Sequence, residues 1–290
     1  MISYTKELIA MRIVDVSVVA AKIEELCLTT NHLLPLDIEK KLIECHKIEK
    51  TKVCKNALDA ILKNIDTAKL LDIPICQDTG MAVVFLDIGQ DVHFTGGNLY
   101  DAVNEGVRSA YVNGRMRCSI VADPLKRMNT NDNTPACIHT RIVNGDRITI
   151  TVAPKGFGSE NMSKLKMFTP SATKEDIIDF VRHTVDIAGS KPCPPIIVGV
   201  GLGGNFESCA ELAKRALIRP LDIRNSDPYY AELENLMLIE INKTGIGAQG
   251  FGGSQTALAV NIIQAPTHIA GLPAAVNIGC HVTRHKTDII

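Results

Sequence analysis

The chain has 290 residues, and its 31 lysines and arginines nearly balance its 32 aspartates and glutamates, for a formal net charge of −1. This balance excludes a strongly basic surface of the kind that binds nucleic acid or anionic membranes. No apolar run is long enough to cross a bilayer. The N-terminal stretch MISYTKELIAMRIVDVS lacks the basic, apolar and cleavage regions of a signal peptide, so we expect a cytoplasmic protein.

The first seventy residues are predicted to be mainly helical. In residues 51–71, apolar side chains recur at steps of three and four, which is typical of an amphipathic helix. Residues 15–28 and 36–48 show the same periodicity. Pro74 then ends the helical region.

Strands and helices mix after Pro74. Strands are expected at residues 81–89, 119–125, 137–143, 146–154, 194–201, 236–245, 257–265 and 273–282. Helices are expected at residues 100–114, 173–189 and 206–217, with Thr173 as the N-cap of the second. The turn Asn144-Gly145-Asp146 predicts a hairpin between two of the strands.

Several predicted strands follow one another without an intervening helix, which argues against a regular doubly wound sheet. We therefore predict an α+β fold, with a helical N-terminal segment packed on mixed, largely antiparallel sheets. We expect one domain over residues 1–290, of which residues 1–70 are mainly helical.

Three segments concentrate glycine beside polar residues: 153–166, 198–210 and 243–256. Glycine lets the backbone approach a ligand closely and lets N–H groups converge on an anion. Segment 198–210 follows a strand and opens a helix, so it indicates tight helix packing, a loop that binds a small anion, or a dinucleotide-binding turn. Its glycine spacing fits the last of these poorly. The stretch GFGSEN, with Lys164 and Lys166 after it, favours a small anion, and an ordinary capping turn explains it equally well.

Nine cysteines are spread along the chain, and no two have the C-x-x-C spacing. An odd number of cysteines in a long chain without an export signal argues against a disulfide framework. If a metal is bound, its ligands come from distant parts of the sequence, and spacing alone does not identify them.

An ordered set of motifs resembles the iron–sulfur-dependent (class I) fumarases and the related L-tartrate dehydratases. The matching segments are PICQDTG, MRCSIVADPLKRMNTNDNTPACIH, KGFGSENMSKLKM, CPPIIVGVGLGG, TGIGAQGFGG, QAPTHIAGLPAAVN and GCHVTRHK. They extend from about residue 74 to residue 286 in the family's order, whereas the helical first seventy residues resemble the family more loosely.

The resemblance implies a 4Fe–4S cluster held by Cys76, Cys193 and Cys280. Three thiolates bind three irons and leave the fourth without a protein ligand. That iron is a Lewis acid able to bind a substrate hydroxyl and a carboxylate oxygen, and its exposure implies lability in air. The other six cysteines are most simply interpreted as packed apolar side chains.

The resemblance also implies which residues surround the substrate. Asp78 is expected to be the general acid, paired with His268, because the departing hydroxide needs a proton. Gln77, Arg117 and Gly158 are expected to bind the substrate, and the planar fork of an arginine suits a carboxylate.

More ordinary roles compete with several of these assignments. A lone histidine such as His268 is more often a satisfied core residue. Apart from the resemblance, an arginine such as Arg117 is more often part of a structural ion pair. His281 and His285 lie beside the third cysteine, and we interpret them as supporting or surface residues rather than catalytic ones.

The sequence ends ten residues after Cys280. In single-chain members of the family, a second domain with the catalytic base follows. We therefore expect an α subunit that is active only with a β subunit, assembled as α2β2.

The expected reaction is the reversible hydration of fumarate to L-malate, a step of the tricarboxylic acid cycle. The alternative substrate is L(+)-tartrate, dehydrated to oxaloacetate. A non-catalytic iron–sulfur sensing protein and a nucleotide-binding dehydrogenase built on residues 198–210 are the competing hypotheses.

Overall fold

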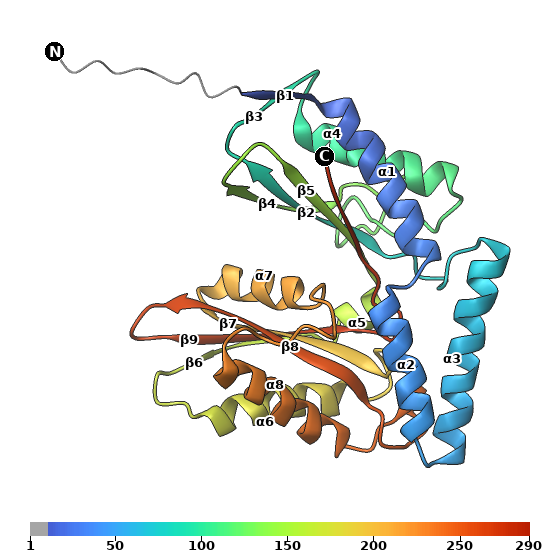
Figure 1. Ribbon diagram of the computed structural model, residues 1–290, viewed down its shortest axis with the longest axis vertical. Helices are drawn as coiled ribbons and strands as arrows, with labels where there is room; N and C mark the ends of the chain where they lie inside the picture. The colour runs from blue at the N-terminus through green and yellow to red at the C-terminus, as the bar shows by residue number, and fades with distance from the viewer. Residues whose placement is uncertain (1–10) are drawn as a thin grey trace. The chain divides into compact units, whose positions relative to one another are not determined.

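The computed structural model describes residues 11–290 (Figure 1). The first ten residues lie outside the described residues. They belong to the segment predicted to be helical and to the N-terminal stretch that lacks the features of a signal peptide. The chain forms two compact units, and the first contains residues 11–30 together with 79–154 and 285–290. The second contains residues 31–78 and 155–284. None of the helices in the described part is both long and apolar enough to cross a membrane.

The first unit packs two helices on a four-stranded sheet. Its elements are β1 (Arg12–Asp15), α1 (Val16–His32), β2 (Met81–Gly89), β3 (Val92–Thr95), α4 (Leu99–Asn113), β4 (Cys137–Val143), β5 (Ile148–Lys155) and β10 (Lys286–Ile289). The sheet has the order β10-β5-β2-β4, and β1 pairs with β3 separately. Buried side chains of α1 and α4, among them Ile23 and Tyr111, pack against β2 and β5 in one core.

The second unit is built on another four-stranded sheet, with the order β6-β9-β7-β8. Its elements are α2 (Leu36–Ile48), α3 (Lys52–Leu71), α5 (Phe157–Glu160), β6 (Lys164–Phe168), α6 (Lys174–Ala188), β7 (Ile196–Gly204), α7 (Phe206–Ala216), α8 (Pro228–Asn242), the short 3₁₀ helix η1 (Ala248–Gly250), β8 (Ala257–Thr267) and β9 (Leu272–Gly279). Helices α6 and α8 cover one face of this sheet and α7 covers the other (Figure 1). Helices α2 and α3 pack together and share a third core with Ile197 and Leu258.

The glycines of β7 let α7 lie close to the sheet. A Cβ on Gly199 would lie 2.1 Å from the carbonyl oxygen of Ala213, and a Cβ on Gly201 would lie 2.1 Å from that of Cys209. The N-terminus of α7 is closed by a capping box between Asn205 and Ser208. The glycine-rich segment 198–210 therefore serves tight packing of a helix on a strand, which is one of its three expected roles.

The predicted α+β class is confirmed, and most predicted elements form within a few residues of their expected ends. Thr173 caps α6 as predicted, in a reciprocal capping box with Asp176. The sheets are mixed as predicted, but parallel pairs are more frequent than the expected, largely antiparallel arrangement implies. Each sheet contains a parallel pair, namely β1–β3, β2–β4 and β7–β8. Parallel neighbours need a long crossover, and α4 and the α7–α8 segment supply two of them.

The predicted hairpin at residues 144–146 is wrong. Its two strands form as β4 and β5, but β2 lies between them and pairs in parallel with β4. Strand β2 is buried along most of its length, whereas the second half of β4 is exposed. The more apolar strand therefore takes the central position, and the turn joins strands that are not neighbours.

Residues 236–245 were predicted to be a strand, and this prediction is wrong because they lie largely in α8. That helix begins at Pro228, with the Asp227 side chain accepting a hydrogen bond from the Tyr229 N–H. Its buried residues Leu233, Met237 and Ile241 recur at steps of four.

The predicted strand at residues 119–125 is also wrong. Only an isolated bridge between Val121 and Asn129 forms there. The Asp123 side chain accepts hydrogen bonds from the backbone N–H groups of Leu125 and Lys126, which holds the segment in a turn.

Candidate functional site

Three loops of the second unit carry the cysteines that the motifs single out. Cys76 follows α3, Cys193 lies between α6 and β7, and Cys280 comes directly after β9. All three belong to the same compact unit, although more than a hundred residues of sequence separate the first from the second. The tertiary fold therefore brings the predicted ligands into one unit.

The three thiols are electrostatically coupled through Cys76. Burial raises the pKa of Cys193, and the neighbouring Cys76 raises it further. Burial also raises the pKa of Cys280, and Cys76 again adds to the increase. The Cys193 and Cys280 loops are joined directly, since His281 donates its backbone N–H to the Cys193 carbonyl oxygen at 3.3 Å. The His281 Nδ1 lies 2.9 Å from the same oxygen.

Accessibility separates these cysteines from the packed ones in the same unit. Cys193 is exposed and Cys76 and Cys280 are half-buried, whereas Cys45, Cys54 and Cys209 are buried. Burial raises the pKa of Cys45 to about 12 and that of Cys209 to about 11, which disfavours their thiolates. The buried cysteines are therefore packed side chains, as expected.

The surroundings of the thiols fit the thiolate ligands of an iron–sulfur cluster. Within residues 11–290, no group of three or more histidine, cysteine, aspartate or glutamate side chains converges closely enough to hold one metal ion. In a cubic iron–sulfur cluster, each thiolate binds a different iron, so the sulfurs do not converge on one point. The Asp78 N–H points to the Cys76 Sγ at 3.4 Å, and the Arg284 and Lys155 cations oppose the effect of burial on the pKa of Cys280. Half-buried thiols with a donor and cations nearby fit an anionic, thiolate-bound group.

The third glycine-rich loop supports the Cys193 loop. The backbone N–H of Gln249 donates to the Pro194 carbonyl oxygen at 2.7 Å, and its side-chain amide donates to the same oxygen at 2.9 Å. Both Cys193 and Gln249 have a φ of +54°, in the left-handed region that non-glycine residues rarely adopt. We did not single out Gln249 from the sequence, where only its place in the TGIGAQG motif marked it.

The GFGSEN turn binds a carboxylate of the protein itself. The Phe157 N–H donates to the Asp78 Oδ2 at 3.0 Å. A Cβ on Gly156 would lie 3.1 Å from the same oxygen, so a side chain there would crowd the carboxylate. The predicted general acid is therefore oriented by the turn that carries Gly158, another predicted site residue.

Lys166, which follows the turn in the sequence, places its ammonium group 4.2 Å from the ring centre of Phe168.

A buried charge network anchors this turn. Lys155 donates to Ser159 Oγ at 2.7 Å and lies 3.3 Å from Glu160 Oε2. Lys214 on α7 donates to Glu160 Oε1 at 2.6 Å, and Asn277 on β9 donates to Oε2 at 2.8 Å. Burial would raise the pKa of Glu160, but the two lysines and these hydrogen bonds lower it to about 2. Burial lowers the pKa of Lys155 to about 8, although the neighbouring Glu160 carboxylate opposes the decrease.

The other predicted site residues lie in different surroundings. Gln77 is exposed beside Cys76, whose thiol is 3.6 Å from the Gln77 amide oxygen. Arg117 is exposed and belongs to the first unit, where its carbonyl oxygen accepts a hydrogen bond from Thr79. The structure thus groups Asp78, Gln77 and the cysteines in one unit and assigns Arg117 to the other.

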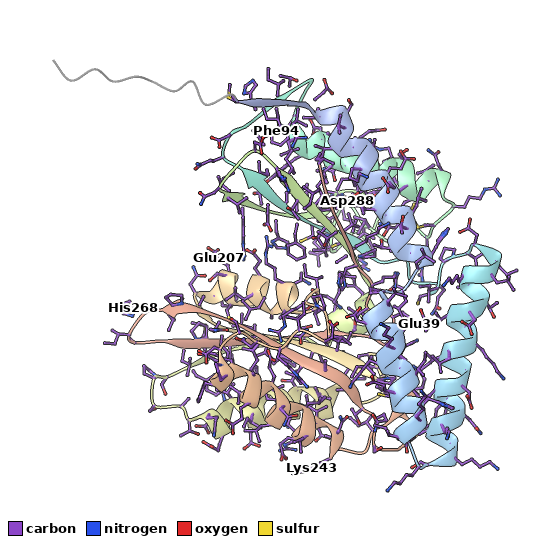
Figure 2. The ribbon with its side chains drawn as sticks, in the orientation of Figure 1. Glu39, Phe94, Glu207, Lys243, His268 and Asp288 are labelled. Atoms are coloured by element: carbon purple, nitrogen blue, oxygen red, sulfur yellow. The ribbon has the colours of Figure 1, made fainter. Side chains whose placement is uncertain are left out.

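His268 lies at the exposed tip of the β8–β9 connection (Figure 2). Its Nδ1 accepts a hydrogen bond from the Ala270 N–H at 3.1 Å, so it is not a core histidine. Strand β9 has 8 residues and separates His268 from Cys280. At about 3.3 Å per residue, that strand is roughly 25 Å long.

Comparison with known proteins gives a consistent result. A family model described as fumarate hydratase matches residues 20–288. The putative L(+)-tartrate dehydratase subunit alpha of Methanocaldococcus jannaschii is 40% identical over 259 residues, covering 87% of this chain and 90% of the relative. The L(+)-tartrate dehydratase subunit alpha of Escherichia coli K12 is 30% identical over 261 residues, covering 89% of this chain and 86% of the relative.

Proposed function

The chain belongs to the fumarate hydratase family, and from this premise we propose that it is the α subunit of a 4Fe–4S hydro-lyase that interconverts fumarate and L-malate. The observation that carries the proposal is that Cys76, Cys193 and Cys280 lie on loops of one compact unit, with Asp78 beside the first and a hydrogen bond joining the loops of the other two. These three cysteines would hold the cluster. When bound, the cluster supplies a Lewis-acidic iron for the substrate hydroxyl and carboxylate.

Asp78 delivers or receives the proton of the hydroxyl group in this proposal. Its Oδ2 is held by the Phe157 N–H, and its backbone N–H faces the Cys76 sulfur. A general acid must be held within hydrogen-bond reach of its proton acceptor, and these contacts restrict where the carboxyl group points.

Gln77, Gly158 and Arg117 are proposed to bind the substrate. The exposed Gln77 amide offers both a donor and an acceptor beside Cys76. Gly158 lies exposed in the turn that also holds Asp78. The Arg117 guanidinium would hold a carboxylate in a bidentate pair.

His268 enters the proposal in a different way. Because β9 separates it from Cys280, we propose that the exposed tip meets the site of a second chain rather than that of its own. An α2β2 assembly would provide such a chain.

A β subunit is proposed to supply the catalytic base and further substrate contacts. The names of the relatives, each a subunit alpha, support a partner of this kind. We propose that the two compact units act together as one cluster-binding α domain in the cytoplasm, and that the cluster is lost in air.

L(+)-tartrate is the second candidate substrate, because the curated relatives above carry the name tartrate dehydratase. Fumarate and tartrate reactions share the hydroxyl and both carboxylates, so the same residues serve both. Anaerobic rates of the α–β complex with L-malate, fumarate and L(+)-tartrate separate the two. Turnover of neither substrate by a cluster-loaded complex would favour a sensing protein.

Cluster binding is tested by iron and sulfide content after anaerobic reconstitution. We expect about four irons per chain, and a loss of most of the cluster in Cys193→Ser. Cys209→Ser is the matched control, since this buried thiol belongs to α7 and packs against Ala275 of β9, and the variant should keep its iron. Equal iron content in both variants would contradict the proposed ligand set, and a bound nicotinamide would favour the dehydrogenase hypothesis.

A further inference from the structure

Arg284 is one of the most deeply buried cations of the second unit, with 3% of its surface exposed. It lies four residues after Cys280, in the motif GCHVTRHK. The motif resemblance assigns this arginine no role, and neither does the proposed chemistry above.

The guanidinium group of Arg284 joins three segments of the chain. Its Nε and Nη2 donate to the Asn31 Oδ1 at 3.2 and 3.0 Å, and Nη2 also donates to the Asp78 carbonyl oxygen at 2.8 Å. Its Nη1 donates to the Val282 carbonyl oxygen at 3.3 Å. Asn31 is itself buried and accepts the Ile75 N–H on its carbonyl oxygen at 2.9 Å. Residues 75–78 are therefore held to residue 31 and to the Cys280 loop by one planar group.

The charge of Arg284 is not balanced by a carboxylate within residues 11–290, because its hydrogen bonds there all go to neutral oxygens. Lys155 differs, since Glu160 lies 3.3 Å from its ammonium nitrogen. A buried charge is costly unless an opposite charge compensates it. Arg284 bonds the carbonyl oxygens of Asp78 and Val282, which lie two residues after Cys76 and Cys280, so its charge lies beside two of the loops that would hold an anionic cluster.

We propose that Arg284 is a positioning residue, which holds the Asp78 loop against the Cys280 loop and supplies the positive charge that a thiolate-bound cluster requires. The proposal rests on the proposed function for the cluster and for the acid role of Asp78, whereas the connection between the loops rests on the hydrogen bonds alone. A planar fork is needed, because an ammonium group cannot reach three acceptors in these directions.

Hydrogen exchange of the full chain without cluster tests the connection. In Arg284→Met, we expect the amides of residues 75–79 and the Phe157 amide to exchange at least tenfold faster, while those of β7 and β9 keep their rates. Arg219→Met is the control for losing a buried arginine of the same unit, because Arg219 also bonds an asparagine oxygen and a carbonyl oxygen, on Asn261 and Ile262. Arg219 differs from Arg284 in being paired with the buried carboxylate of Glu234. The control should leave residues 75–79 unchanged.

Cluster retention tests the charge. After anaerobic loading, Arg284→Met should lose iron to a chelator at least tenfold faster than the unsubstituted chain, and Arg284→Lys should recover part of the loss because it keeps the charge. In the α–β complex, Arg284→Lys should lower kcat more than it changes KM, since Arg284 bonds the backbone of Asp78, the proposed acid, rather than that of Gln77.

Three outcomes would overturn the proposal. The first is unchanged exchange at residues 75–79 in Arg284→Met. The second is a uniform increase in exchange over the whole unit in both Arg284→Met and Arg219→Met. The third is loss of iron at the same rate from Arg284→Met, Arg284→Lys and the unsubstituted chain. If Arg284→Met does not fold, Arg284→Lys decides the exchange test. An unsubstituted chain that binds no iron refutes the proposed function and the charge role, and the exchange result still decides the connection between the loops.

Discussion

Replacing Glu160 by glutamine removes the one negative charge of the Lys155–Glu160–Lys214 network and keeps the shape of the side chain. The pKa of Glu160 falls from its ordinary value of 4.5 to about 2 because the two lysines and their hydrogen bonds outweigh burial. Each pH unit of that difference is worth about 1.4 kcal/mol, which gives on the order of 3 kcal/mol of stability at pH 7. Since 25% of the Glu160 side chain is exposed, solvent screening reduces this to about 2 kcal/mol.

The sign of the pH dependence follows from the lowered pKa of Glu160. The stabilisation is present above pH 4.5 and is lost as the pH falls toward 2, because the carboxylate is protonated first in the unfolded chain. Urea unfolding should therefore show Glu160→Gln less stable at pH 7 and the difference shrinking at pH 3. Glu240→Gln is the control, since Glu240 pairs with Lys243 at the surface, and it should cost less than about 0.5 kcal/mol. A loss for Glu160→Gln that is equal at both pH values would refute the reasoning.

Three further substitutions test the site and the packing. Asp78→Asn keeps an acceptor for the Phe157 N–H but cannot donate a proton as an acid, so kcat of the α–β complex should fall about a hundredfold or more with iron content unchanged; an unchanged kcat would exclude Asp78 as the acid. Gly201→Ala places a methyl group against the Cys209 carbonyl and should destabilise the chain by about 3 kcal/mol in urea, whereas Gly271→Ala, in open surroundings, should be nearly neutral. Thr173→Ala removes the α6 cap and should cost about 1 kcal/mol in the same assay, and no measurable loss would show that the capping box contributes nothing.

The local sequence predicted the elements whose own residues carry the signal. Helix α3 forms where the apolar spacing places it, and α6 begins after Thr173 because the cap and its partner are three residues apart. Strand β2 forms over residues 81–89, as its apolar run predicted. Hydrogen bonds and periodicity within one segment decide such elements, so a short window of sequence contains the information.

Strand neighbours depended on competition between distant segments. The turn at residues 144–146 indicated a hairpin, yet β2 occupies the place between β4 and β5 because its side chains are better buried at the centre of the sheet. Residues 236–245 are apolar enough to form a strand. They form a helix because α8 begins at Pro228 and its apolar side chains pack into the core of the second unit.

The candidate site shows the same division. Ordered motifs, each of them local, are enough to propose the cysteines, Asp78 and the glycine turn as site residues. The groups that hold these residues in place could not be predicted. Gln249 and Arg284 donate hydrogen bonds to carbonyl oxygens of residues far away in the chain. Any residue type offers such an oxygen, so the acceptor leaves no signature in the sequence. Only the folded chain determines which donor reaches it.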